Sequence, residues 1–146
     1  MTVALSGKDI AGKLEEKFPG STVTADEKQV LVKSDSLLLV AGFLKDTPEI
    51  DLSYLNFITA VDYGDYFEVV YRISSLEHNH WLTLKTRVAD RESPALTSVY
   101  GVWPAADFQE REIYDLMGIK FNGHPNMKRI FLWDGFAGHP LRKDYL

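Results

Sequence analysis

The sequence has no cysteine among its 146 residues. This absence excludes disulfide bonds, thiol nucleophiles, and iron–sulfur or zinc sites with cysteine ligands held by this chain. No apolar run approaches the roughly 20 residues that a membrane-spanning helix requires, and the longest one, residues 37–44, favours a buried helix. Residues 1–5 lack the charged and apolar regions of a secretion signal, so we expect an intracellular protein without direct membrane insertion.

Positive charge is also scarce, with 16 Lys and Arg against 21 Asp and Glu and a net charge of −5. Nucleic-acid-binding domains are normally basic, so we expect no nucleic-acid partner. Hydrophobic residues make up 45% of the chain and charged residues 25%, which is close to the average of globular proteins. The composition therefore predicts one folded domain with a substantial core.

Hydrophobic periodicity divides the chain into helices and strands. A first helix is expected after a cap at Ser6, because Ile10, Leu14 and Phe18 recur at a spacing of four before the break at residues 19–20. Residues 66–74 alternate strictly, which is typical of a half-buried strand. The other expected elements are strands at 21–25, 29–33, 54–62 and 80–88, and a helix at 36–45.

The three strands at 54–62, 66–74 and 80–88 are joined by short turns and predict an antiparallel meander. In the first of them we expect Leu55, Phe57 and Val61 to share one face. Because helices precede and follow this meander, we predict an α+β fold. Its antiparallel or mixed β-sheet has helices packed on one face, and an irregular C-terminal tail follows.

Two helices are expected after the meander. Ser93 and Pro94 have the pattern of a helix start, with Gly101 as the end of a short helix. A longer helix spans residues 105–117, with Gly118 in the left-handed conformation beyond it. Residues 1–117 are therefore predicted to form the α+β part of the domain.

Residues 118–146 differ from the rest of the chain. They hold four of the ten glycines and two of the six prolines, and they carry a net charge of +3 while the remainder carries −8. They also contain five aromatic residues, too many for a solvated tail. Such a segment either wraps its own domain or orders itself against a partner. We favour the second and predict that 118–146 is an extended basic and aromatic docking segment.

Glu110, Arg111 and Glu112 are the residues most indicative of chemistry. Paired carboxylates can act as general acid and base, but Glu110 and Glu112 lie about 200° apart around a helix. Asp107, Arg111 and Asp115 follow one another at a spacing of four, which predicts an ion-pair row on the helix surface. We therefore expect helix support or an interface contact and no catalytic residue.

Four histidines are the other candidates. His78 and His80 are two apart and could ligate a metal, although Asn79 between them favours a turn. His124 and His139 each stand between Gly and Pro, so we expect tight bends with the rings bonded to nearby groups. A metal-dependent hydrolase using His78, His80 and a carboxylate stays open as an alternative, as does a self-sufficient binding module.

Residues 110–125, continued by 128–130, resemble the signature of the 30 kDa subunit (the C subunit) of proton-pumping NADH–quinone oxidoreductase, respiratory complex I. Residues 59–63, 98–104 and 138–145 also resemble this family. The resemblance implies a peripheral-arm subunit on the cytoplasmic side of the cell membrane, packed against the quinone-site (D) subunit and close to the B and I subunits. It also implies that FMN, iron–sulfur clusters and quinone belong to partner subunits and that this chain binds no cofactor or metal.

The family signature implies a set of docking residues in the helix and the tail: Glu110, Arg111, Glu112, Tyr114, Asp115, His124, Pro125, Arg129, His139, Pro140, Arg142, Lys143, Asp144 and Tyr145. Related complexes share this module, so the equivalent subunit of a membrane-bound hydrogenase, a formate hydrogenlyase or a deazaflavin-dependent dehydrogenase is the alternative function.

Overall fold

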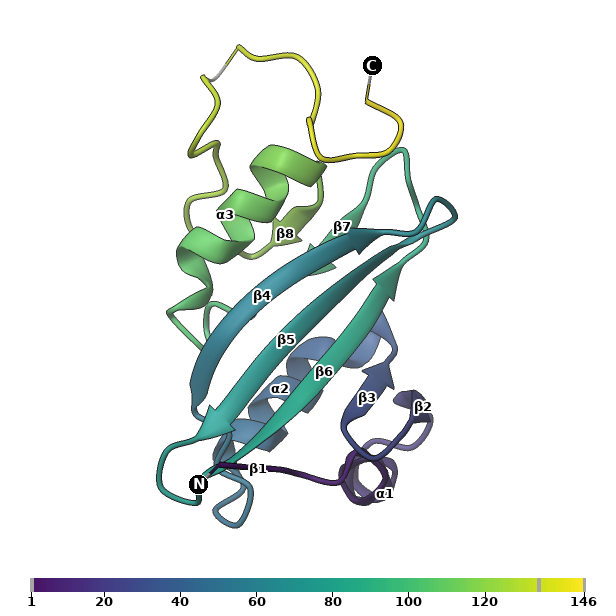
Figure 1. Ribbon diagram of the computed structural model, residues 1–146, viewed down its shortest axis with the longest axis vertical. Helices are drawn as coiled ribbons and strands as arrows, with labels where there is room; N and C mark the ends of the chain where they lie inside the picture. The colour runs from purple at the N-terminus through teal and green to yellow at the C-terminus, as the bar shows by residue number, and fades with distance from the viewer. Residues whose placement is uncertain (1, 134, 146) are drawn as a thin grey trace.

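The computed structural model describes residues 2–133 and 135–145. Three residues lie outside the described ones: Met1 of the predicted α+β part, and Asp134 and Leu146 of the predicted docking segment. The elements in chain order (Figure 1) are β1 (Val3–Ala4), α1 (Gly7–Lys17), β2 (Thr22–Ala25), β3 (Gln29–Val32), η1 (Ser34–Ser36), α2 (Leu37–Asp46), β4 (Tyr54–Asp62), β5 (Phe67–Ser75), β6 (His80–Val88), β7 (Ala95–Thr97), α3 (Ala106–Met117) and β8 (Lys120–Asn122).

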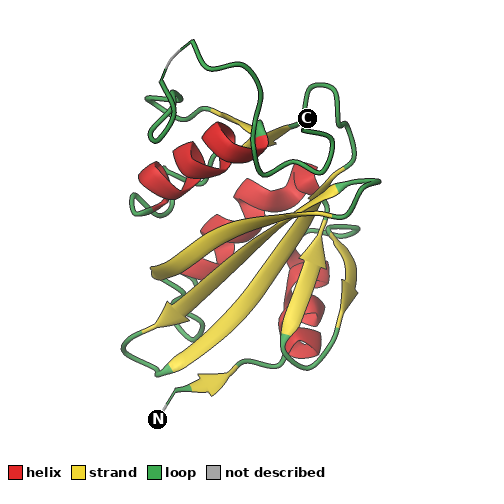
Figure 2. Cartoon of the chain, turned by 45° about the horizontal axis from the view of Figure 1, so that its top comes forward, coloured by secondary structure: helices red, strands yellow, loops and turns green. Residues whose placement is uncertain are grey.

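Within the described ranges, a mixed six-stranded sheet organises the fold. Its strand order is β2-β3-β6-β5-β4, and β1 also pairs with β6. Strands β4, β5 and β6 form the predicted antiparallel meander, whereas β1 and β3 run parallel to β6. Helices α1 and α2 lie behind this sheet and α3 lies beside β4 (Figures 1 and 2). The predicted α+β fold with a mixed sheet is confirmed.

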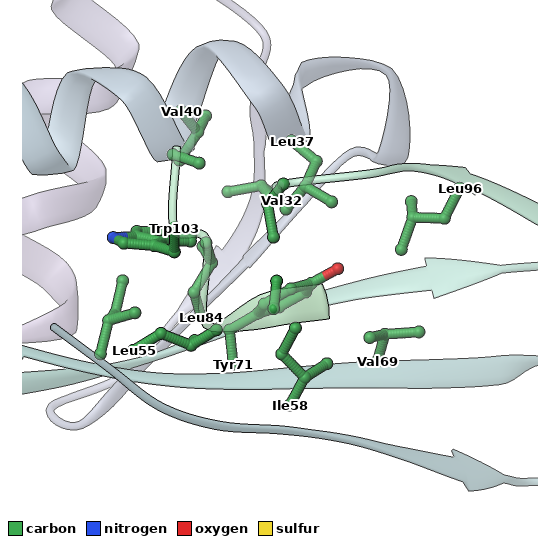
Figure 3. Close-up of a cluster of buried hydrophobic side chains, with 14 of the residues drawn as sticks. Val32, Leu37, Val40, Leu55, Ile58, Val69, Tyr71, Leu84, Leu96 and Trp103 are labelled. Atoms are coloured by element: carbon green, nitrogen blue, oxygen red, sulfur yellow. The ribbon is translucent and has the colours of Figure 1, made fainter. Parts of the chain in front are cut away.

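The core lies between the sheet and the helices. Alternate residues of β5, among them Val69 and Tyr71, are fully buried and lie with Leu84 of β6 on the side of the sheet that faces α2 (Figure 3). Trp103 completes this core from the loop before α3, and its indole N–H donates to the carbonyl oxygen of Leu52 at 2.9 Å. Burying apolar side chains of this size provides the main stabilisation of the fold.

The face predicted for strand β4 is wrong. The pairing of β4 with β5 shifts between Leu55 and Phe57, so Asn56 is an extra residue that reverses the alternation. Leu55 and Ile58 are buried, whereas Phe57 and Val61 point to the opposite face with 40% and 38% of their surface exposed. A bulge of this kind leaves no mark in a hydrophobic pattern, because both faces of β4 carry apolar residues.

The short helix predicted from Ser93 and Pro94 is also wrong. Residues Ala95–Thr97 form strand β7, which pairs in parallel with β8, more than 20 residues later in the chain. Pro94 begins this pairing, since its carbonyl oxygen accepts from the N–H of Lys120 at 3.0 Å. A tertiary partner thus overrides a local helix-start signal. In the residues that the structure describes, no helix has the length and apolar composition to cross a bilayer.

Candidate docking face

Helix α3 connects the sheet to the C-terminal tail, by which we mean residues 118–146. The helix lies along the edge strand β4, where Gln109 Oε1 accepts a hydrogen bond from the backbone N–H of Ile58 at 2.5 Å. As predicted, α3 ends at Gly118 in the left-handed conformation, with φ +79°, and the N–H of Gly118 donates to the Tyr114 carbonyl. The tail therefore starts from a fixed point at the end of the helix.

Glu110 faces inward from α3 and is fully buried. Its Oε1 accepts from the Ser98 hydroxyl at 2.5 Å and its Oε2 accepts from the N–H of Val99 at 2.9 Å. Burial raises the pKa of Glu110, and these two hydrogen bonds offset part of the effect. This signature residue therefore fixes the loop between β7 and α3 inside the domain.

Arg111 and Asp115 hold the first part of the tail. Arg111 donates through Nε to the Lys128 carbonyl at 3.0 Å and through Nη2 to the Arg129 carbonyl at 3.1 Å. The Asp115 carboxylate accepts from three consecutive backbone N–H groups, those of residues 130–132, at 2.7–3.3 Å. Both side chains thus bind tail backbone. The predicted ion-pair row of Asp107, Arg111 and Asp115 is wrong, because each of these side chains faces the tail that covers the helix.

Arg129 completes the site around Asp115. Its Nη1 lies 2.9 Å from Asp115 Oδ1, and its Nη2 donates to the Gly138 carbonyl at 2.8 Å. Burial alone would raise the pKa of Asp115, but the N–H donors of residues 130–132 and the Arg129 guanidinium together lower it. Asp115 is therefore held as a buried carboxylate that fixes residues 129–132 of the tail.

The two Gly-His-Pro segments form bends, as predicted. His124 has a fully buried side chain whose Nδ1 accepts from the N–H of Asn126 at 2.9 Å, which leaves the ring proton on Nε2. Nε2 lies 3.1 Å from the carbonyl oxygen of Asp107 and 3.0 Å from its Oδ1, with the carbonyl better aligned. His139 Nδ1 lies 3.0 Å from the Asp115 carbonyl oxygen. The two histidines therefore bind the tail to α3 near both of its ends, at Asp107 and at Asp115.

The end of the tail is attached to the end of β4 and to the loop between β6 and β7, beside which it lies in Figure 1. Asp62 accepts two hydrogen bonds from Arg91, at 2.6 and 2.9 Å, and one from the N–H of Lys143 at 2.8 Å. Arg142 donates to the Arg91 carbonyl at 2.7 Å and pairs with Asp144 at 3.0 Å. The Arg91 side chain holds the pKa of Asp62 far below the usual range for a carboxyl group. We call this group of residues the C-terminal latch.

The outer side of the tail and of α3 exposes large apolar side chains. Phe131 is 62% exposed, Trp133 69% and Leu141 60%, and Phe108 on α3 is 66% exposed. The remaining predicted docking residues are half-buried or exposed: Glu112, Tyr114, Pro125, Pro140, Lys143, Asp144 and Tyr145. Two of them also contact their own domain, since Tyr114 packs against His139 and Asp144 pairs with Arg91 and Arg142. The structure thus gives the tail an inner side bound to its own domain and an outer side that is free of it.

The sequence does not predict three residues of this face: Ser98, which binds Glu110, Arg91, which binds Asp62 and Asp144, and Gln109, which binds the backbone of Ile58. Each acts across a loop or across elements, so only the fold brings it to its partner. Among the residues described, no group of three or more histidine, aspartate or glutamate side chains is placed to hold a metal ion. His78 and His80 instead lie 2.9 and 2.5 Å from backbone carbonyl oxygens of the loop after α2, those of Pro48 and Ile50.

Comparisons with known proteins agree with the fold. Residues 30–146 match the family of the respiratory-chain NADH dehydrogenase 30 Kd subunit. The NADH-quinone oxidoreductase C subunit of Parvibaculum lavamentivorans is 39% identical over 99% of this chain and 72% of that protein. The C subunit of Moorella thermoacetica is 40% identical over 91% of this chain and 90% of that protein. A chain in the structure of a membrane-bound sulfane sulfur reductase, an archaeal respiratory membrane complex, is 25% identical with a TM-score of 0.71, over 94% of this chain and 84% of that chain.

Fold and comparisons together define the class of protein, a subunit of a membrane-associated respiratory complex with oxidoreductase activity. More particularly, the chain belongs to the family of the 30 kDa subunit of respiratory-chain NADH dehydrogenase. Both bacterial relatives are named as the C subunit of NADH-quinone oxidoreductase.

Proposed function

We propose that this chain is a non-redox structural subunit in the peripheral arm of a proton-translocating NADH–quinone oxidoreductase, on the cytoplasmic side of the membrane. In this role it docks to the quinone-site (D) subunit and lies close to the iron–sulfur (B and I) subunits. FMN, the clusters and quinone are bound by those partner subunits. The absence of cysteine supports this division of labour, because iron–sulfur clusters are held mainly by cysteine thiolates.

The observation that carries the proposal is the two-sided construction of the tail. Its inner side is fixed by Arg111 and Asp115, so the backbone that bears Phe131 is already ordered. Its outer side presents Phe131 and Trp133 with more than 60% of their surface exposed. Large aromatic side chains on an ordered backbone are suited to an interface core, because little conformational entropy is lost when they bind.

Charge supports the same face. The tail carries +3 while the rest of the chain carries −8, and Lys128 and Lys143 are exposed on it. A basic strip on an acidic domain orients encounter with an acidic partner surface and disfavours the wrong face. The contribution to catalysis is then geometric: the subunit helps to hold electron carriers bound elsewhere at tunnelling distance.

One alternative has a specific observation in its favour. The same fold, at a TM-score of 0.71, occurs in a complex described as a sulfane sulfur reductase. That name gives sulfane sulfur as the species reduced, so the fold also occurs in a respiratory membrane complex with another electron acceptor. The equivalent subunit of a related complex, a hydrogenase, formate hydrogenlyase or deazaflavin-dependent dehydrogenase, is therefore the second candidate function. The identity of the chains that co-purify with this one from native membranes distinguishes the two.

The test compares two exposed apolar residues on different faces. Phe131→Ser removes a side chain of the docking face and leaves its backbone N–H to Asp115, whereas Leu39→Ser removes a side chain of α2 that is 59% exposed. We expect a tenfold lower yield of co-purified partner subunits with the Phe131 variant and an unchanged yield with the Leu39 variant, both with wild-type circular dichroism. Equal recovery with both variants would refute docking through the tail.

A further inference from the structure

The open face of the sheet is the surface of β4, β5 and β6 that points away from α1 and α2. No helix of the described chain covers it, and the tail passes beyond its upper end (Figures 1 and 2). The strand register places Phe57, Thr59, Val61, Val70, Arg72 and Trp81 together on this face. This surface is separate from the docking face of α3 and the tail.

Strand β4 is apolar on both of its faces. Leu55 and Ile58 are buried against the core, and yet Phe57 and Val61 occupy the open face. An antiparallel strand with one solvated face alternates apolar and polar residues, whereas a strand covered on both sides is apolar throughout. Strand β6 follows the first pattern beyond Trp81, with Thr83, Lys85 and Arg87 outward. The excess apolar surface is therefore confined to one region of the open face.

Arg72 lies in the middle of this region in a fixed orientation. Its guanidinium carbon is 3.8 Å from the centre of the Trp81 ring and 5.8 Å from that of Phe57. Its Nε donates to the Thr83 hydroxyl at 3.2 Å, and within the described ranges no carboxylate pairs with it. A guanidinium stacked on aromatic rings is suited to an interface contact, because Arg and Trp are enriched among the residues that contribute most to binding energy.

The charges on this face define the partner. Glu68 is buried beneath two cations, with Lys85 at 3.3 Å and Arg87 at 3.2 Å, so its charge is neutralised within the domain. Asp26 also lies beside Lys85, so Arg72 is the positive charge of this face that has no carboxylate partner in the described chain, although residues 1–117 together carry −8. A positively charged surface on a negatively charged domain favours a partner that has a carboxylate at the interface.

We propose that the open sheet face is a second protein-docking surface, which receives an apolar segment of a neighbouring subunit with a carboxylate opposite Arg72. The assembled complex then covers both faces of β4, which accounts for its apolar residues on both sides. This surface goes beyond the docking of the tail and does not depend on it, because it rests on different residues and a different layer of the fold.

The absence of cysteine allows a direct test, since Thr59→Cys introduces a unique thiol between Phe57 and Val61. Maleimide labelling is compared in the isolated chain and in the complex purified from membranes. We expect labelling to slow at least tenfold in the complex, while Lys13→Cys on the exposed side of α1 reports reagent access. Equal labelling rates for Thr59→Cys in the two states would overturn the proposal. Protection already present in the isolated chain, with the mass of a dimer, would assign the face to a second copy and overturn it too.

The charge requirement is tested with Arg72→Glu and Arg72→Lys. We expect the Glu variant to lose at least tenfold of the co-purified partner. The Lys variant should lose clearly less than the Glu variant, because Lys retains the positive charge although it lacks the planar group that stacks on the rings. If Arg72→Glu left the amount of co-purified partner unchanged, no partner carboxylate would lie opposite Arg72, and the proposal would be contradicted. Since Thr59 labelling reports on the sheet face alone, protection of Thr59 together with normal assembly of Phe131→Ser would refute the tail docking and support this surface.

Discussion

The Asp115 carboxylate and the Arg129 guanidinium lie 2.9 Å apart between helix α3 and the tail, and the same carboxylate binds three consecutive backbone N–H groups. One buried side chain on the helix therefore determines the conformation of the segment that carries the exposed aromatic residues. The order of the tail is a property of this chain, and its outer side is what a partner would meet.

Replacement of Asp115 by Ala is expected to release the tail locally. The three N–H groups and Arg129 lose their acceptor, and each unsatisfied buried group is worth about 1–3 kcal/mol. Hydrogen exchange should therefore accelerate at least tenfold in residues 130–132, as measured by mass spectrometry, while strands β5 and β6 keep their protection. Glu112→Ala, at an exposed position of the same helix, serves as the control and should leave exchange unchanged. Retained protection of residues 130–132 in the Asp115 variant would contradict this role.

Glu110 provides a matched pair of substitutions. Glu110→Ala leaves the Val99 N–H without an acceptor and creates a cavity, so we expect about 2–4 kcal/mol less free energy of unfolding. Glu110→Gln keeps an acceptor for Val99 and a donor for Ser98, and it removes a carboxyl group whose pKa burial raises. Its loss should be below about 1 kcal/mol. Urea denaturation at pH 7 measures both, and equal losses would show that the hydrogen bonds are unimportant.

Asp62 makes part of the stability dependent on pH. Because Arg91 and backbone N–H groups lower its pKa in the folded state, its contribution is present above the ordinary value of 3.8 and is lost as the pH falls towards the folded value. We expect Asp62→Asn to be about 2 kcal/mol less stable than the wild type at pH 7, with the difference shrinking as the pH falls below 3.8. Asp35→Asn, at an exposed site of η1, is the control. A difference that stays constant between pH 7 and 2 would exclude this explanation.

Two glycines should respond to alanine in opposite directions. Gly118 has φ +79°, and a Cβ there would lie 2.7 Å from the His139 ring, so Gly118→Ala should destabilise the protein by more than about 1 kcal/mol. Gly42 lies inside α2 with nothing within 4 Å of the added Cβ, so Gly42→Ala should stabilise by about 0.5–1 kcal/mol. Thermal unfolding measures both, and a shift of the same sign for the two variants would contradict the description of the helix end.

The sequence predicts those parts of the fold that depend on local pattern. Alternation in residues 66–74 predicts the half-buried strand β5, and the glycine after residue 117 predicts the end of α3. Features that require a distant partner were missed, such as the pairing of β7 with β8 and the bulge at Asn56. The spacing of Asp107, Arg111 and Asp115 predicts mutual ion pairs, and this prediction is wrong because a sequence does not show that a later segment covers the helix.

The central claim is that this chain supports electron transfer by holding its neighbours and takes no part in the chemistry. Arg111→Ala removes two hydrogen bonds to the tail backbone and leaves the core intact. The decisive measurement is the amount of assembled complex in membranes together with its NADH–quinone turnover per assembled complex. The claim predicts less assembled complex with unchanged turnover in each one. A normal amount of complex that turns over slowly would instead place this surface in the reaction itself.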